Sequence, residues 1–366
     1  MMRAGPTAGR LVEGRASLLR WWPIEVRIVS MSRDVLIWAS QHLATVAEGT
    51  NAEYSQHTIY AVCDDDFVAE SYRHLTREGT HPIEPYRGDT WLAGQAHARP
   101  AWARAHVESI ARGAVVIINE AERTWTIGAA DTHTLCQAVV RFSRELLRAE
   151  LASRGAYTFH AACAEDSVGR GLLFCGESGT GKTSLALQIA QSGYIVSGDR
   201  TLVLTDGEDS LVAVGFPWSL RVGPGTLRSL GYAQQHRFLR TETSDYEAGD
   251  QKIEFTAMEA TALLNSPSTA TCRVSCIVVV ADADSAVPDS LRVRDQEREV
   301  VLAPHIREPD PAFGPFWHHG QGNRPAMRHE VRLASLVGGT PIVRLRWDPR
   351  RHSARQAHEA IMLALP

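Results

Sequence analysis

The chain has 366 residues, of which 44% are hydrophobic and 22% charged, a balance typical of a globular protein rather than a disordered one. A formal net charge of −4 gives no reason to expect a nucleic-acid partner. No apolar run reaches membrane-spanning length, so we expect no membrane association and a cytoplasmic protein. The length suits two or three domains, or one elaborated domain.

Residues 1–30 combine five arginines and two glutamates with glycine and proline. They contain no apolar core of signal-peptide length, so we expect a loose N-terminal extension, with Met31 as a candidate for the true start. The alternation over residues 24–28 leaves an edge strand open as an alternative.

Residues 31–155 mix short apolar runs with loops, which predicts a small α+β domain. Residues 58–63 read as a strand, and the three aspartates at 64–66 are interpreted as a solvated turn rather than a metal site. Residues 115–118 and 125–127 are predicted to pair as strands. We recognise no catalytic constellation in this part of the sequence.

Residues 131–153 are predicted to form a helix that Asp131 or Thr132 can cap. Its apolar residues recur at helical spacing and form one stripe, and most of its charged residues lie away from that stripe. The stripe consists of Leu135, Val139, Phe142, Leu146 and Leu147, and the charged residues are Arg141, Arg144, Glu145, Arg148 and Glu150.

A phosphate-loop motif stands at the centre of the sequence, within the stretch GLLFCGESGTGKTSLAL at 171–187. The apolar run 172–175 predicts a buried strand, and residues 184–191 predict a helix, which is the context that such a loop requires. The predicted nucleotide-binding residues are Gly176, Glu177, Ser178, Gly179, Thr180, Gly181, Lys182, Thr183 and Ser184.

The residue types of this motif suit the binding of nucleotide phosphates. The glycines let several backbone N–H groups face one point, which lies at a helix N-terminus where an anion is favoured. Lys182 supplies a mobile positive charge for the outer phosphates, and the Thr183 hydroxyl is a hard oxygen ligand suited to Mg²⁺. A glycine-rich turn without a ligand is the alternative interpretation.

A carboxylate follows the next predicted strand. Residues 194–197 lead to Asp199, and a carboxylate near a phosphate loop can hold Mg²⁺ or take a proton from an attacking hydroxyl. An ordinary turn aspartate is the alternative.

The stretch from His160 to Leu204 resembles the catalytic core of HPr kinase/phosphorylase and its relatives. The resemblance rests on His160 in the preceding strand, the loop GESGTGKT, the helix that ends at Gly193, and Gly198-Asp199-Arg200. Counted without gaps from the loop lysine, Asp199 falls on the first aspartate of the family's Asp-Asp pair. Arg200 stands where the family has the second aspartate, so the sequence departs from the family pattern at that position. The match covers about 45 residues, from 160 to 204.

This resemblance implies an α/β fold with a phosphate-loop, HPr-kinase-like (PEP-carboxykinase-like) core over residues 156–366. It implies ATP- and Mg²⁺-dependent transfer of the γ-phosphate to a serine or threonine of a peptide or protein partner. Asp199, His160 and Lys182 are the implied catalytic residues, and Thr183 and Asp199 the metal ligands. A homo-oligomer remains open, and so does reversal by inorganic phosphate.

Two other functions remain open on the same core. One is a small-molecule kinase that acts on an amino-acid-like acceptor, and the other is a nucleotide-binding regulatory module without phosphate transfer.

Several further residues are weaker candidates. Arg221, downstream of the Gly215–Pro217 loop, could contact a phosphate or lie on the surface. The apolar run 276–280 ends near Asp282 and Asp284, as a metal-binding strand or an ordinary parallel strand would. His305, His318 and His319 are interpreted as surface histidines.

The remaining sequence signals are structural. Residues 342–347 read as a late strand and residues 353–365 as a closing helix. Six cysteines are scattered along the chain, Cys63, Cys136, Cys163, Cys175, Cys272 and Cys276, and we expect no disulfide framework. Cys272 and Cys276 could be half of a metal site, but no second pair follows at zinc spacing, so both are predicted to be buried strand cysteines.

Overall fold

A computed structural model shows a mixed α/β protein, as the sequence predicts at this coarse level. Its described residues divide into an N-terminal unit, residues 15–150, and a C-terminal unit, residues 151–307 and 337–365. The described residues are 15–21, 24–43, 55–77, 79, 81–86, 89–96, 99–104, 113–119, 121–206, 210–215, 220–223, 226–227, 230–231, 253–256, 259–260, 262, 269, 271–283, 285, 287–307 and 337–365. Among them, no helix combines the length and apolar character needed to cross a bilayer.

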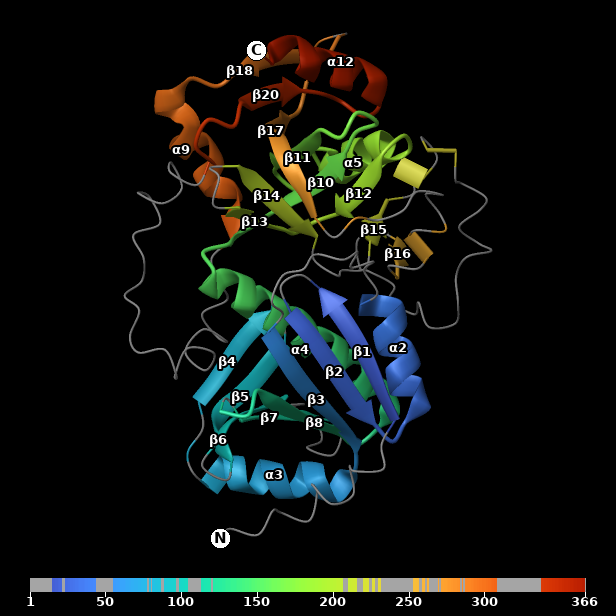
Figure 1. Ribbon diagram of the computed structural model, residues 1–366, viewed down its shortest axis with the longest axis vertical. Helices are drawn as coiled ribbons and strands as arrows, with labels where there is room; N and C mark the ends of the chain where they lie inside the picture. The colour runs from blue at the N-terminus through green and yellow to red at the C-terminus, as the bar shows by residue number, and fades with distance from the viewer. Residues whose placement is uncertain are drawn as a thin grey trace. The chain divides into compact units, whose positions relative to one another are not determined.

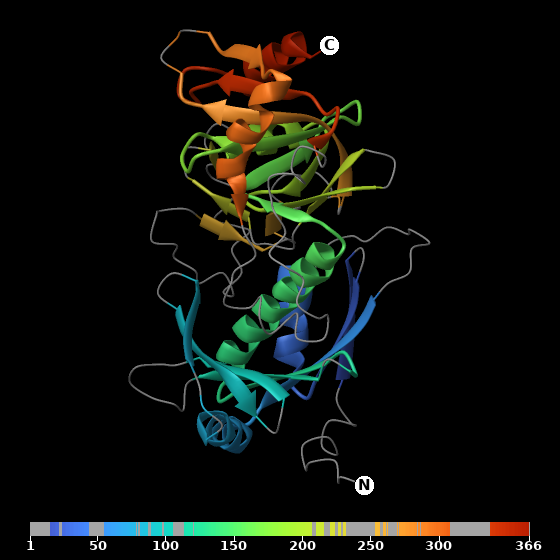
Figure 2. The ribbon, with the colours of Figure 1, turned by 90° about the vertical axis from the view of Figure 1, so that its left-hand side faces the viewer.

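The N-terminal unit is built on a mixed sheet whose described strands follow the order β1-β2-β3-β8-β7-β6-β5-β4 (Figure 1). β2, β3 and β8 run parallel, and the other neighbours are antiparallel. Figure 2 shows α3 and α4 on opposite faces of this sheet. The elements are β1 (Arg15–Trp21), β2 (Ile24–Ser30), α2 (Arg33–Leu43), β3 (Ser55–Cys63), α3 (Asp65–Arg77), β4 (His81–Tyr86), β5 (Asp89–Ala96), β6 (Arg99–Arg104), β7 (Ala114–Asn119), β8 (Thr124–Ala129) and α4 (Thr132–Ser153).

Residues 15–21 and 24–30 differ from the loose extension that the sequence predicts. They form the hairpin β1–β2, and β2 lies inside the sheet between β1 and β3 rather than at its edge. The physical reason is the alternation of Ile24, Val26 and Ile28, all fully buried, which gives β2 one complete core face. Residues 1–14 lie outside the described residues.

The three aspartates after β3 do not form the predicted turn. Asp64 accepts a hydrogen bond from the backbone N–H of Phe67 at 3.0 Å, and Asp65 and Asp66 open helix α3. Carboxylates are favoured at this end of a helix because unpaired backbone N–H groups face them. Their clustering therefore has a local structural cause.

Helix α4 confirms the predicted apolar stripe and corrects the prediction for its charged residues. Asp131 caps it by accepting from the backbone N–H of Thr134 at 2.8 Å. Glu145 and Arg148 are buried as well, and Arg148 Nε donates to Glu145 Oε2 at 2.6 Å. The ion pair satisfies both charges where water cannot reach them.

The C-terminal unit contains a second mixed sheet, centred on β17. β17 runs parallel to β11 and β20 and antiparallel to β14. The elements are β9 (Tyr157–Phe159), β10 (Ala161–Glu165), β11 (Gly171–Gly176), α5 (Lys182–Ala190), β12 (Tyr194–Ser197), β13 (Thr201–Thr205), β14 (Leu211–Gly215), β15 (Leu220–Val222), β16 (Ile253–Phe255), β17 (Thr271–Ala281), β18 (Asp289–Arg292), η3 (Asp295–Glu297), α9 (Arg298–Leu302), η4 (Ala303–His305), β19 (Ile306–Arg307), β20 (Ile342–Arg346) and α12 (Ala354–Ala364).

This second sheet has two parts that share β17. One part runs β12-β10-β11-β17-β20-β18, and the other runs β17-β14-β13-β9-β19. The chain crosses from one part to the other between β9 and β10, and crosses back between β12 and β13. These two crossings are neighbours, because β10 pairs with β12 and β9 pairs with β13.

Each face of the second sheet carries an apolar cluster. One cluster includes α5, α12 and side chains such as Leu172 and Val278, and the other includes Leu173, Ile277 and Leu302. Cys272 and Cys276 are buried in these strands, which confirms the prediction made for them. The late strand and the closing helix are confirmed as β20 and α12.

Candidate functional site

The predicted phosphate loop lies between β11 and α5, as the sequence predicts. β11 is buried along its whole length and pairs with β17, with Gly176 opposite Val280. A Cβ at Gly176 would lie 2.6 Å from the carbonyl oxygen of Val280, so glycine is required where the strand turns into the loop. Gly181 then caps α5 in the left-handed conformation, with φ 88°. The loop is thus positioned by a core strand and opens a helix, the geometry that favours anions.

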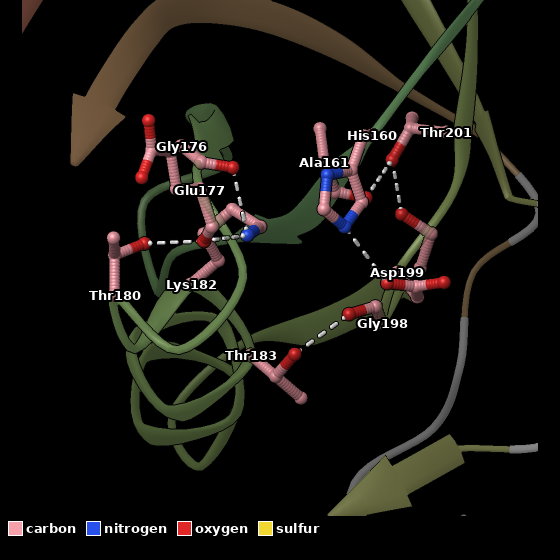
Figure 3. Close-up of polar contacts among 11 residues, drawn as sticks. His160, Ala161, Gly176, Glu177, Thr180, Lys182, Thr183, Gly198, Asp199 and Thr201 are labelled. Atoms are coloured by element: carbon pink, nitrogen blue, oxygen red, sulfur yellow. Dashed lines mark hydrogen bonds and ion pairs between the residues drawn. The ribbon is translucent and has the colours of Figure 1, made fainter. Parts of the chain in front are cut away.

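Lys182 is folded back onto its own loop (Figure 3). Its Nζ donates to the carbonyl oxygen of Gly176 at 2.9 Å and to that of Glu177 at 2.6 Å. Thr180 Oγ1 also donates to the Glu177 carbonyl, at 3.0 Å. The loop therefore curls around a buried ammonium group.

Thr183 connects the loop helix to the crossing between β12 and β13. Its Oγ1 donates to the carbonyl oxygen of Gly198 at 2.8 Å (Figure 3). Ser184, the next residue, is buried, and its Oγ lies 2.6 Å from Thr226 Oγ1. Thr183 thus contacts the backbone next to Asp199, whereas the Ser184 hydroxyl is hydrogen-bonded to Thr226 instead.

His160 and Asp199 point toward each other across the two crossings. His160 Nε2 lies 3.3 Å from Asp199 Oδ1, and the Asp199 side chain is 59% exposed (Figure 3). The hydrogen bond with His160 lowers the pKa of the Asp199 carboxyl below its ordinary value, and the charge of His160 adds to this. Burial opposes this shift and is the second-largest effect, while the charges of Arg200 and Lys182 lower the pKa a little further. Asp199 is therefore held in its ionised form.

Hydrogen bonds fix both crossings. Ser197 and Thr201, which flank the second crossing, are joined through their hydroxyl groups, and Thr201 Oγ1 donates to the Ala161 carbonyl at 2.9 Å. The backbone N–H of His160 donates to the carbonyl oxygen of His305 at 2.8 Å. His305 thus contributes a main-chain contact to the site, a role that its residue type did not indicate.

All these groups lie at one edge of the first part of the sheet. β11, β17 and β20 are parallel and end at this edge, and β12 ends there as well because β10 is antiparallel to both β11 and β12. Binding sites of open α/β sheets form at the carboxyl ends of the strands. The topology therefore gathers His160, Asp199 and the loop where a ligand can approach.

Two oxygen donors of this site suit Mg²⁺, the Thr183 hydroxyl and the Asp199 carboxylate. Because Thr183 gives its hydrogen to Gly198, a lone pair of the hydroxyl oxygen is left for an ion. Within the described ranges, no three His, Cys, Asp or Glu side chains gather as metal ligands would. The donors present fit an ion whose remaining ligands are phosphate oxygens and water.

Other predicted candidates are not joined to this cluster. Asp282 is exposed just after β17, at the same edge, and makes no hydrogen bond or ion pair with the residues that the structure describes. Asp284, His318, His319, Phe216, Pro217 and the Arg221 side chain lie outside the described part.

The sequence reasoning missed Trp347, which packs on Gly181. The only signal was its place at the end of the strand predicted over residues 342–347.

Comparison of the chain with models of known protein families finds no match, and comparison with curated proteins finds none either.

Proposed function

We propose that the protein is an ATP- and Mg²⁺-dependent kinase that transfers the γ-phosphate to a serine or threonine hydroxyl of a peptide or protein. The observation that carries the proposal is the contact of Asp199 with His160 beside the phosphate loop. It provides a candidate base next to a candidate phosphate site. The strand, loop and helix from β11 to α5 support a phosphate-loop core of the HPr-kinase-like (PEP-carboxykinase-like) type.

Lys182 and the loop amides would bind the nucleotide phosphates. Lys182 would exchange two neutral carbonyl partners for charged phosphate oxygens, and hydrogen bonds between charged groups are the stronger kind. Its charge would then offset the negative charge of the phosphoryl group during transfer. Mg²⁺ held by Thr183, Asp199 and phosphate oxygens would add positive charge at the same place.

Asp199 would act as the base. Oδ1 faces His160, which leaves Oδ2 for the proton of the acceptor hydroxyl. The exposure of Asp199 allows an acceptor to reach it, and its pKa, held below the ordinary value, leaves the carboxylate ionised at neutral pH. A positioned base typically accelerates such a step by about a hundredfold or more.

The acceptor class follows from the resemblance of residues 160–204 to HPr kinase/phosphorylase. The test is transfer of radiolabel from γ-labelled ATP to three acceptors: a degenerate peptide mixture with serine or threonine at its centre, free serine or threonine, and water. We expect label in the peptides. Label in the free amino acids would replace this proposal by a small-molecule kinase. Tight ATP binding without any labelled acceptor would indicate a regulatory module.

A further inference from the structure

The buried ring of Trp347 forms a wall against the phosphate loop. Trp347 follows β20 and is fully buried. A Cβ built at Gly181 would lie 2.4 Å from Trp347 Cζ3, 3.1 Å from Cε3 and 3.4 Å from Cη2. The indole therefore occupies the space beside Gly181 that a side chain would need.

Gly181 is the point at which the loop becomes a helix. It adopts a left-handed conformation, with φ 88° and ψ 13°, directly before Lys182. Its carbonyl oxygen accepts the first helical hydrogen bond, from Leu185 N at 3.0 Å. A shift of Gly181 would turn the N–H groups that face the phosphate position.

The position of Trp347 is set by elements other than the loop. Its backbone N–H donates to the carbonyl oxygen of Ala281 at 2.9 Å, at the end of the pairing of β20 with β17. Its ring belongs to the same apolar cluster as Ala357 and Ile361 of α12. The wall is therefore fixed by the sheet and by the C-terminal helix.

The indole N–H of Trp347 has no acceptor among the described residues. A buried donor without an acceptor costs folding free energy, and a phenylalanine or leucine would avoid that cost. Among the described residues it is therefore the ring of Trp347, and not its N–H, that makes the contacts with Gly181 and with the apolar cluster.

We propose that Trp347 is a positioning residue that holds Gly181 in place and thereby sets the affinity of the loop for nucleotide phosphates. This inference rests on the proposed function insofar as the ligand is a nucleotide. Trp347 acts through the backbone of Gly181.

The test compares Trp347→Phe with Ile361→Ala. The smaller ring of phenylalanine would fill less of the space beside Gly181, whereas Ile361 is equally buried in the same cluster but is not among the nearest neighbours of Gly181. We expect the Kd for ATP, ADP and tripolyphosphate to rise in parallel by about tenfold in Trp347→Phe, as misplaced binding groups commonly cause. Trp347→Leu is a second variant with the same expected change.

The control separates positioning from stability. Ile361→Ala removes core volume and lowers the melting temperature, yet its Kd should stay near the wild-type value when all variants are measured well below their melting temperatures. Unchanged affinity in Trp347→Phe, or an equal loss in Ile361→Ala, would overturn the inference.

Amide hydrogen exchange decides the inference even if the proposed function fails. If the wild-type protein binds no nucleotide, the kinase proposal is wrong, but the loop amides of residues 179–183 still report on Gly181. Faster exchange of these amides in Trp347→Phe than in Ile361→Ala supports a positioning role. Equal exchange in the two variants contradicts it.

Discussion

His160 Nε2 and Asp199 Oδ1 lie 3.3 Å apart at the two places where the chain crosses between the parts of one sheet. The pairing of β10 with β12 and of β9 with β13 makes these crossings neighbours. Backbone pairing therefore positions both side chains. Because the side chains do not take part in that pairing, replacing either one should not disturb the sheet. Substitutions at these positions can therefore test chemistry separately from folding.

Replacing Asp199 should remove phosphate transfer but not nucleotide binding. Asp199→Asn keeps the shape and loses the proton acceptor, so transfer should fall by about a hundredfold or more. Mg-ATP should still bind, somewhat more weakly, because Thr183, Lys182 and the loop amides remain. Nucleotide affinity and radiolabel transfer to peptide are measured side by side.

Asp282→Asn is the matched control, because Asp282 is an exposed carboxylate at the same sheet edge. It should leave transfer nearly unchanged. If Asp282→Asn abolishes transfer and Asp199→Asn does not, the base has been assigned to the wrong strand.

Replacing His160 should change the pH dependence of transfer. His160 lowers the pKa of Asp199, so in His160→Ala the pKa of Asp199 should rise toward its ordinary value. The base then becomes protonated at a higher pH, and the acid limb of the pH–rate profile should shift to higher pH. Transfer at neutral pH should slow because the Asp199 carboxylate loses the hydrogen bond that orients it, while the Kd for ATP stays close to that of the wild type. A slower variant with an unmoved acid limb would mean that His160 acts on the phosphate or the acceptor instead.

Lys182→Ala should abolish ATP-dependent chemistry and leave the fold intact. The ammonium group donates to carbonyl oxygens of its own loop, and the apolar residues of α5 keep the helix packed. Circular dichroism and thermal unfolding check the fold, and ATP turnover checks the chemistry. Arg355→Ala, a change at an exposed residue of α12, is the control for loss of a positive charge. Full turnover by folded Lys182→Ala would make the phosphate-loop assignment wrong.

His57, a largely buried residue of β3, should make the free energy of unfolding fall in mild acid. Burial lowers its pKa from 6.5 to about 4, an effect that the charge of Glu150 only partly offsets and that of Arg123 reinforces. The unfolded chain therefore binds a proton that the folded chain does not. Above pH 6.5 the protonation of His57 does not affect the free energy of unfolding. As the pH falls from 6.5 toward 4, the free energy of unfolding decreases, by up to about 3 kcal/mol over the whole window.

The measurement is the free energy of unfolding by denaturant at several pH values between 7 and 4.5. His57→Leu should reduce the pH dependence, whereas His133→Gln, a change at an exposed histidine, should not. An unchanged pH dependence in His57→Leu would assign the acid sensitivity to other groups.

Local sequence was sufficient for the features that depend on neighbouring residues. The strand, loop and helix around Lys182 could be predicted because glycine spacing and apolar runs act within a few residues. The stripe of α4 could be predicted for the same reason, since helical periodicity determines which side chains share a face. The residues of the candidate site, including His160 and Asp199, came from the motif and from the resemblance built on it.

Only the tertiary structure decided what these residues contact. The approach of His160 to Asp199 depends on which strands pair at the crossings, and that of Trp347 to Gly181 depends on β20 joining β17. The burial of the Glu145–Arg148 pair and the place of β2 inside its sheet also depend on long-range packing. The pattern within one strand indicates which of its faces is buried, but contacts between residues distant in sequence depend on the order in which the strands pair, which that pattern does not specify.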